Sequence, residues 1–279
     1  MIKKLKTGKA DGCLGLDSDC IVHGPERLCF LLSVLLRAIM VHGYAPEILL
    51  LGTMCPIPKQ NSMAHISDKY RAITLVSLVL KLLDYIVIEH QSHVFQTDAL
   101  QFGFKAKSST TLCTSMVAET VRQFNAGKSN VYAVLLDATK AFDRVEFTKL
   151  FGLLLDRGMD ALFVRCLLNM YLNQKLRIRW NNCFSETFSV KNGVKQGGVI
   201  SPLLFGIYID VLIKQLRDSG LGCYMGPFFI GCTTYADDVV LLSPTKTGLS
   251  KMLDICQEYS ETYHLQFNGG KSQFTVYSP

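Results

Sequence analysis

The stretch "TTYADDVVLLS", residues 233 to 243, places the adjacent carboxylates of Asp237 and Asp238 between two runs of β-prone, largely apolar residues. Like charges repel, and burying either one without a counter-ion is costly. Aspartate tolerates the backbone angles of a tight turn, so the pattern predicts strand, turn and strand. An isolated pair of aspartates is usually a solvated turn, and a catalytic interpretation therefore needs a carboxylate from elsewhere in the chain.

A matching carboxylate ends a second apolar run. "VYAVLL" (131–136) is apolar at every position, as expected of a central strand buried on both faces, and Asp137 follows it. A strand end beside a hairpin tip can bring carboxylates of separate segments together. Mg²⁺ prefers a few carboxylates with water and substrate phosphates. Two such ions about 4 Å apart activate an attacking hydroxyl and stabilise a leaving oxygen. We therefore expect Asp137, Asp237 and Asp238 to bind two Mg²⁺ ions, for which Mn²⁺ can substitute.

The composition indicates a globular, intracellular protein. Apolar residues make up 49% of the 279 residues, and 29 basic against 23 acidic residues give a net charge of +6, which is compatible with a nucleic-acid partner. The ten cysteines form no C-x-x-C pair, and no signal peptide is evident, which predicts reduced thiols in the cytoplasm or nucleus. The most apolar run, residues 28–41, is too short to span a bilayer, so no membrane partner is expected.

Helices and strands are predicted to be mixed along the chain. Apolar spacing and capping residues predict helices over 25–42, 146–156, 159–172, 201–217 and 248–263. Strand signals occur at 49–59, 131–136, 175–190 and 233–243, while 70–95 starts extended and then becomes helical. Because the regular alternation of a doubly wound sheet is absent, the fold class is expected to be α+β.

Several segments resemble the motifs of reverse transcriptases. The palm motifs are matched in order by "LLDATKAFDRV" (135–145), "NGVKQGGVISPLLFGIYID" (192–210), "TYADDVVLL" (234–242) and "HLQFNGGKSQF" (264–274). The fingers motifs of the non-LTR (LINE-type) group are matched by "CPIPK" (55–59), "DKYRAITLVSLVLKLLDYIV" (68–87) and "QFGFKAKSSTT" (101–111). The resemblance covers almost the whole chain. It implies a right-hand polymerase fold and an RNA-directed DNA polymerase that adds dNTPs to a DNA primer on an RNA template.

The resemblance also implies roles for the palm residues. Asp137 and Asp237 match the metal-bridging aspartates of the family, and Asp238 matches its accessory carboxylate. Lys271 matches the lysine that neutralises or protonates the pyrophosphate leaving group. Phe142 matches an aromatic gate against the ribose 2′-hydroxyl. The alternative interpretation of Phe142 is a core residue under the following helix.

Other residues match groups that hold the substrates. Lys59 and Arg71 match cations that grip the incoming triphosphate, although a solvated surface cation would look the same in sequence. Gln196 and Gly197 match the loop that contacts the nascent base pair, and an ordinary loop before a helix is the alternative. Lys105 and Lys107 are expected to face the template backbone.

The predicted organisation is a single reverse transcriptase domain with three parts. Residues 1–48 form an N-terminal extension and a fingers helix, 49–130 form the fingers and 131–279 form the palm. Because the sequence stops shortly after the fourth palm motif, the thumb and the endonuclease regions of a parent polyprotein are expected to be missing. Two alternatives stay open: an inactive nucleic-acid-binding remnant of such an element, and a group II intron-type maturase polymerase.

Overall fold

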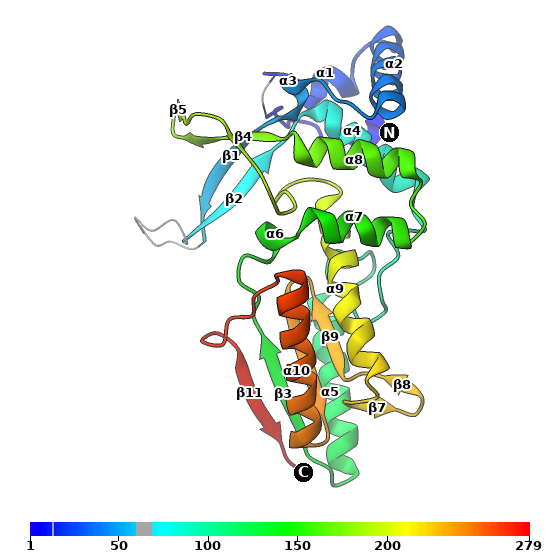
Figure 1. The fold of residues 1–279 in the computed structure, drawn as a ribbon, viewed down its shortest axis with the longest axis vertical. Coiled ribbons are helices and arrows are strands. Elements are labelled where there is room, and N and C mark those ends of the chain that lie inside the picture. Colours follow the sequence, from blue (N-terminus) through cyan, green and yellow to red (C-terminus); the bar gives the residue numbers. More distant parts are fainter. Residues whose placement is uncertain (13, 60–68) are drawn as a thin grey trace. The chain divides into compact units, whose positions relative to one another are not determined.

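The computed structural model describes residues 1–12, 14–59 and 69–279 (Figure 1). Cys13, and Asp68 of the 68–87 motif, lie outside these ranges. The chain divides into two compact units, each built from two separate segments. The first unit contains residues 1–94 and 150–201, and the second contains 95–149 and 202–279. The predicted division at residues 48 and 130 follows motifs rather than compactness, and it stays a prediction.

The first unit combines a helical layer with a mixed sheet. Its sheet has the order β2-β1-β4-β5, with β6 also pairing with β4. Strands β1 and β2 are antiparallel, whereas β1 and β4 are parallel. Its elements are η1 (Ile2–Lys4), α1 (Ser18–Val22), α2 (Glu26–His42), α3 (Glu47–Leu50), β1 (Leu51–Pro58), β2 (Tyr70–Leu75), α4 (Leu78–His90), α7 (Phe147–Asp156, which begins before the unit), α8 (Ala161–Leu172), β4 (Lys175–Trp180), β5 (Cys183–Phe184) and β6 (Phe188–Ser189).

The core of the first unit is formed where α2 packs against α4 and α8. Helix α2 buries Leu32, Leu36 and Ile39, which recur at helical spacing. It ends as predicted at Gly43, which adopts the left-handed conformation (φ 64°) that favours glycine. The 28–41 run therefore contributes one face to the core, as predicted, but Phe30, Leu31 and Val34 on it are more than half exposed. No helix of the described residues is both long and apolar enough to cross a membrane.

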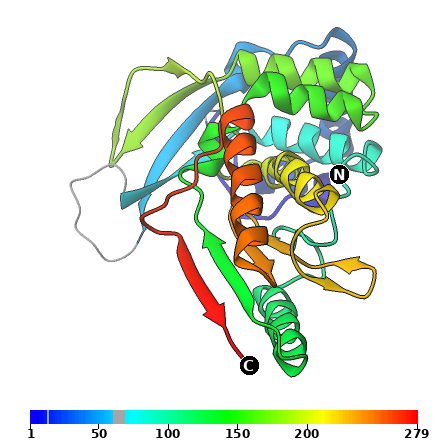
Figure 2. The same ribbon diagram turned by 60° about the horizontal axis from the view of Figure 1, so that its bottom comes forward.

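The second unit is a four-stranded antiparallel sheet with a helix on each face. The strand order is β11-β3-β10-β9. Figure 1 shows α10 in front of this sheet and α5 behind it, and Figure 2 shows the same elements after rotation. Its elements are α5 (Thr110–Ala126), β3 (Val131–Leu136), α6 (Ala141–Arg144), α9 (Ser201–Asp218), β7 (Tyr224–Met225), β8 (Phe228–Phe229), β9 (Cys232–Tyr235), β10 (Asp238–Ser243), α10 (Lys246–Tyr263) and β11 (Gln273–Tyr277).

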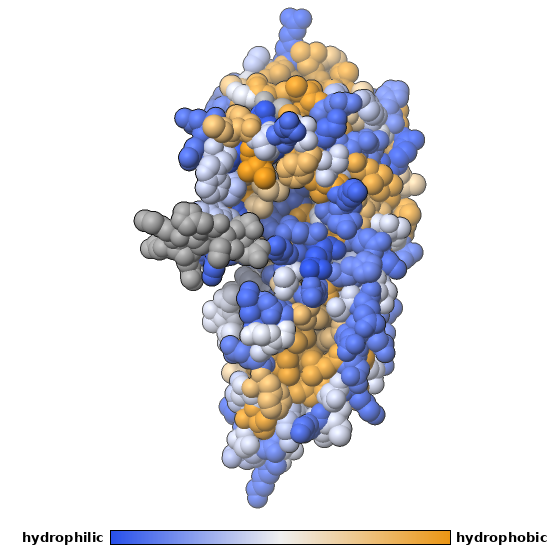
Figure 3. All heavy atoms as spheres, turned by 60° about the vertical axis from the view of Figure 1, so that its left-hand side comes forward, coloured by the Kyte–Doolittle hydropathy of each residue, from blue (hydrophilic) through white to orange (hydrophobic). Residues whose placement is uncertain are grey.

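The central strand β3 is less completely covered than its sequence predicts. Val131 and Ala133 are buried against α5 and Leu242, but Leu135 is 42% exposed. On the edge strand β11, Phe274 and Val276 are also exposed, and Figure 3, which brings that side forward, shows apolar residues gathered over the second unit. The prediction of burial on both faces is therefore wrong at the carboxyl end of β3. This end leads directly to Asp137.

The cysteines of the described ranges are all free thiols, and several of them are buried. Burial raises the pKa of Cys223 and of Cys256 to about 12, so these thiols stay protonated and unreactive. Free thiols agree with the expectation of reduced cysteines. The compartment itself stays a prediction.

Candidate active site

The two adjacent aspartates lie at a tight hairpin between β9 and β10. Tyr235 pairs with Asp238, which leaves Ala236 and Asp237 as the connecting residues. Ala236 has a φ of 58°, a conformation that glycine, asparagine or aspartate adopts at the first turn position far more readily than alanine. The predicted turn is confirmed, but its unusual backbone angle falls on Ala236 and not on an aspartate. Asp238 is already the first residue of β10.

The structure brings Asp137 to the same end of the sheet. Val239 pairs with Leu136, so Asp238 and Asp137 are the next residues along these two adjacent strands. Partial burial raises the pKa of Asp238, and the charge of Asp137 raises it further. Burial also raises the pKa of Asp237, opposed by its own backbone N–H and reinforced by the charges of Asp238 and Asp137. The three carboxylates therefore repel one another across the strand ends.

This donor set fits a divalent cation in its chemistry. Carboxylate oxygens are the ligands that Mg²⁺ prefers, and the mutual repulsion of the carboxylates is what a bound cation relieves. Within the described ranges, however, no three His, Cys, Asp or Glu side chains are arranged closely enough to hold an ion. The side chains thus have the right identity and location without a ligating arrangement.

A loop between α10 and β11 places a lysine beside Asp137. The Asn268 N–H donates to the Asp137 carbonyl oxygen (2.7 Å), and the Asp137 N–H donates to Ser272 Oγ (3.4 Å). Lys271 Nζ lies 3.7 Å from Asp137 Oδ2. Asn268 and Ser272 were missed from sequence, where the only signal was the turn-prone "NGG" before Lys271. The segment that carries Lys271 is therefore joined to the end of β3 through the backbone of Asp137.

Phe142 lies within an aromatic cluster of the second unit. Its ring stacks on Phe205 of α9, with 4.8 Å between ring centroids and 13° between ring planes. Phe104 contacts it edge-on at 5.9 Å. Phe205 is fully buried, whereas Phe142 is half-buried and Phe104 is 53% exposed. Phe142 is thus packed as the core interpretation expects, and its gate role stays a prediction.

The fingers cations lie on the β1–β2 hairpin of the first unit. Ile57 pairs with Arg71, and the Lys59 N–H donates to the Lys69 carbonyl oxygen (2.8 Å). Directly paired residues of a hairpin project from one face, as do alternate residues of a strand. Lys59, Lys69 and Arg71 therefore share a face, and all three are exposed. Lys69 was not singled out from sequence.

The Gln196–Gly197 loop is fixed to β2. The Thr74 N–H donates to the Gln196 carbonyl oxygen (2.7 Å). Gly197 has a φ of 112°, and a Cβ there would lie only 2.9 Å from the Thr74 carbonyl oxygen. The glycine thus permits a close backbone approach to a strand of this chain.

A buried aspartate anchors the other end of this loop. Asp84 on α4 is 6% exposed, and burial raises its pKa to about 6, opposed by the charge of Lys195 and by the backbone N–H groups of Ile200 and Val199. Lys195 Nζ lies 4.8 Å from the centroid of the Tyr171 ring. Asp84 was missed from sequence, although a single carboxylate inside the apolar run "LVLKLLDYIV" was an available signal.

Comparison with known proteins defines the class. The family model of reverse transcriptase (RNA-dependent DNA polymerase) matches residues 57–278, so the chain belongs to this family. The chain is 27% identical to the Pol polyprotein of the type-2 retrotransposable element R2DM from Drosophila melanogaster, over 87% of this chain and 23% of that protein. It is 25% identical to the RNA-directed DNA polymerase of mobile element jockey from Drosophila funebris, over 97% of this chain and 30% of that protein.

These relatives make the chain a non-LTR, LINE-type reverse transcriptase domain, as its motifs predict. It spans only about a quarter of the length of these curated relatives. Among solved structures, the chain is similar to apo telomerase from Candida tropicalis truncated from its C-terminal domain. That match has a TM-score of 0.60 and 13% identity, and it covers 89% of this chain and 55% of the other. The predicted α+β, right-hand polymerase fold is confirmed.

Proposed function

We propose that this chain catalyses the addition of dNTPs to the 3′-hydroxyl of a DNA primer, directed by an RNA template. The observation that carries the proposal is the convergence of Asp137, Asp237 and Asp238 at one end of the β3–β10 pair, where the pKa values of Asp237 and Asp238 are raised. Reverse transcriptases use divalent metal, and we assign these three carboxylates as its ligands. Two Mg²⁺ or Mn²⁺ ions, when bound, supply activation of the primer hydroxyl and stabilisation of the leaving oxygen.

Lys271 contributes charge at the leaving group. Its side chain is 68% exposed, and its ammonium lies 3.7 Å from Asp137 Oδ2. In the free protein it offsets part of the negative charge of Asp137. With a triphosphate bound, the same flexible ammonium can turn to the pyrophosphate oxygens and neutralise or protonate them.

Phe142 and the fingers cations position the nucleotide. The half-buried Phe142 ring is held by Phe205 stacking, so a rigid aromatic surface meets the sugar and disfavours a 2′-hydroxyl. Lys59 and Arg71, on one exposed face of their hairpin, bind the triphosphate as a point charge and as a two-pronged donor. Gln196 and Gly197 support the nascent base pair from their loop against β2.

Primer extension tests the proposal. The purified chain is given poly(rA)/oligo(dT), dTTP and Mg²⁺ or Mn²⁺, beside Asp237→Asn and the control Asp254→Asn, which removes an exposed aspartate of α10. We expect extension by the wild type and the control, and at least about a 100-fold loss in Asp237→Asn, because transition-state stabilisation of this size is typical of such groups.

The other outcomes separate the alternatives. Salt-sensitive binding of primer–template without extension would favour the inactive nucleic-acid-binding remnant. Extension that is unaffected by Asp237→Asn would refute the assignment of the site.

A further inference from the structure

A segment before α5 lies along the hairpin that carries the aspartates. The Phe102 N–H donates to the Thr234 carbonyl oxygen (2.8 Å), and the Thr234 N–H donates to the Leu100 carbonyl oxygen (2.9 Å). Gln101 thereby forms a parallel bridge with Thr234 of β9. The backbone of residues 100–103 thus lies alongside β9 and reaches the turn at Ala236.

The Gln101 side chain makes two hydrogen bonds to that turn and a third to its own segment. Its Oε1 accepts from the N–H groups of Ala236 (3.1 Å) and Gly103 (2.7 Å). Its Nε2 donates to the Ala236 carbonyl oxygen (3.4 Å). Gln101 is 1% exposed, so water cannot replace these bonds if the side chain is lost.

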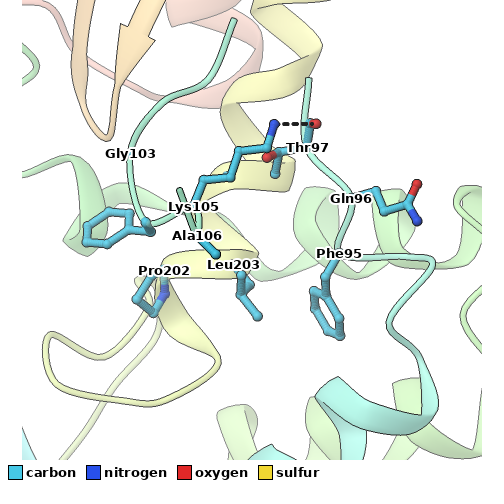
Figure 4. Close-up of a pocket in the computed structure, with 10 residues that line it drawn as sticks. Phe95, Gln96, Thr97, Gly103, Lys105, Ala106, Pro202 and Leu203 are labelled. Atoms are coloured by element: carbon cyan, nitrogen blue, oxygen red, sulfur yellow. Dashed lines mark hydrogen bonds between the residues drawn. The ribbon is translucent and has the colours of Figure 1, made fainter. Parts of the chain in front are cut away.

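Gly103 completes the contact by close approach. A Cβ at Gly103 would collide with the Ala236 backbone nitrogen and lie 2.8 Å from Ala236 Cα. The backbone continues to Lys105, whose ammonium donates to the carbonyl oxygens of Thr97 (3.1 Å) and Asp98 (2.9 Å), the first of which is drawn in Figure 4. Lys105 therefore closes its own loop through these two carbonyl groups, and its expected contact with a template stays a prediction.

We propose that Gln101 and Gly103 are positioning residues that hold the strained Ala236 turn, and through it Asp237 and Asp238, at the end of the β3–β10 pair where the divalent cation is assigned. An alanine with positive φ leaves this conformation unless its surroundings impose it. The carboxamide grips both polar groups of Ala236, and the aspartates follow in the next two positions. This inference rests on the proposed function, since the cation site is the one assigned there.

Mn²⁺ binding to the purified chain tests the inference without requiring catalysis. The free Mn²⁺ signal in electron paramagnetic resonance gives the half-saturation concentration for each variant. Gln101→Met keeps the side-chain length but removes the hydrogen bonds, and Gly103→Ala presses a methyl group onto Ala236. Residues that orient metal ligands typically contribute about 10–100-fold to affinity, so we expect each variant to raise the half-saturation concentration at least about 10-fold.

Matched controls come from the first unit. Gln91→Met removes a buried amide whose Oε1 accepts from the Asp160 N–H (3.1 Å), and Gly152→Ala adds a methyl group with nothing within 4 Å. Both controls should bind Mn²⁺ like the wild type. The inference would be overturned if folded Gln101→Met and Gly103→Ala had the same half-saturation concentration as the wild type. Unfolding of both variants, or no Mn²⁺ binding by the wild type, would also overturn it. Mn²⁺ binding without primer extension would instead count against the proposed function alone.

Discussion

Replacing Asp84 by asparagine should remove the pH dependence that this carboxyl gives to the stability of the first unit, while the buried ammonium of Lys195, whose pKa is lowered by burial to about 8, loses its counter-charge. The pKa of this buried carboxyl is raised from 3.8 to about 6, chiefly by burial. At about 1.4 kcal/mol per pKa unit, ionised Asp84 costs the folded state roughly 3 kcal/mol relative to its protonated form. Asp84 is only 6% exposed, so solvent screening reduces this figure little.

The sign follows from the direction of the pKa shift. The folded state holds its proton at a higher pH than the unfolded state, so the contribution to stability is complete below pH 3.8 and is lost as the pH rises through about 6. Asparagine cannot ionise, yet its carbonyl oxygen can still accept from the N–H groups of Val199 and Ile200. Between pH 4 and pH 7 the unfolding free energy of Asp84→Asn should therefore gain about 2–3 kcal/mol relative to the wild type.

Urea unfolding followed by fluorescence measures this difference. Trp180 is the sole tryptophan of the sequence and lies in β4 of the first unit, so its emission reports on the unit that contains Asp84. Asp254→Asn, in the second unit, serves as the control. If the wild type and Asp84→Asn show the same pH dependence from pH 4 to pH 7, the interpretation of Asp84 as a buried, costly charge is refuted.

Three further predictions concern the site itself. Lys271→Met should reduce the primer-extension rate about 100-fold, because a charge at the leaving group is lost. It should change the unfolding free energy by less than about 1 kcal/mol, because the pair with Asp137 is largely exposed. Unchanged extension kinetics would contradict the role of Lys271. Arg71→Ala should raise the KM for dTTP at least about 10-fold, since a guanidinium–phosphate contact is lost, whereas Arg122→Ala on α5 should leave KM unchanged; equal values in steady-state kinetics would reject the assignment. The Mn²⁺ concentration that half-saturates the wild type should rise as the pH falls, because protons compete for Asp237 and Asp238 at a higher pH than for ordinary carboxyls. Binding that does not depend on pH in the electron paramagnetic resonance titration would exclude these residues as ligands.

The elements that could be predicted are those with a strong local pattern. The apolar run at 131–136 became β3, and the carboxylates at 237–238 became the end of a hairpin. Helix α5 was missed, although Met116, Val117, Val121 and Phe124 recur at helical spacing in "TTLCTSMVAETVRQFNA" and pack against the core of the second unit. The edge strand β11 was also missed, since all of its residues are exposed and its conformation depends on pairing with β3.

The residue types at the site were predictable, but the groups that restrain them were not. Gln101 and Ala236 are 135 positions apart, so no local periodicity links them. The same is true of Asp84 and the 195–200 loop, which meet only after α4 has packed in the core. A carboxamide or a carboxylate inside an apolar run marks a buried polar contact. Only the fold identifies its partner.

Exposure separates two kinds of polar residue in this chain. The groups assigned to chemistry are accessible, with side-chain exposure of 68% for Lys271 and 37% for Asp137, whereas Gln101 and Asp84 are 1% and 6% exposed. Removing an accessible charge leaves no unpaired buried group, so it should change catalysis with little change in stability. Removing a buried residue that holds a loop in place should change both catalysis and stability, because that loop carries the active groups. Measuring stability and metal affinity on the same variants therefore distinguishes residues that perform the chemistry from those that position them.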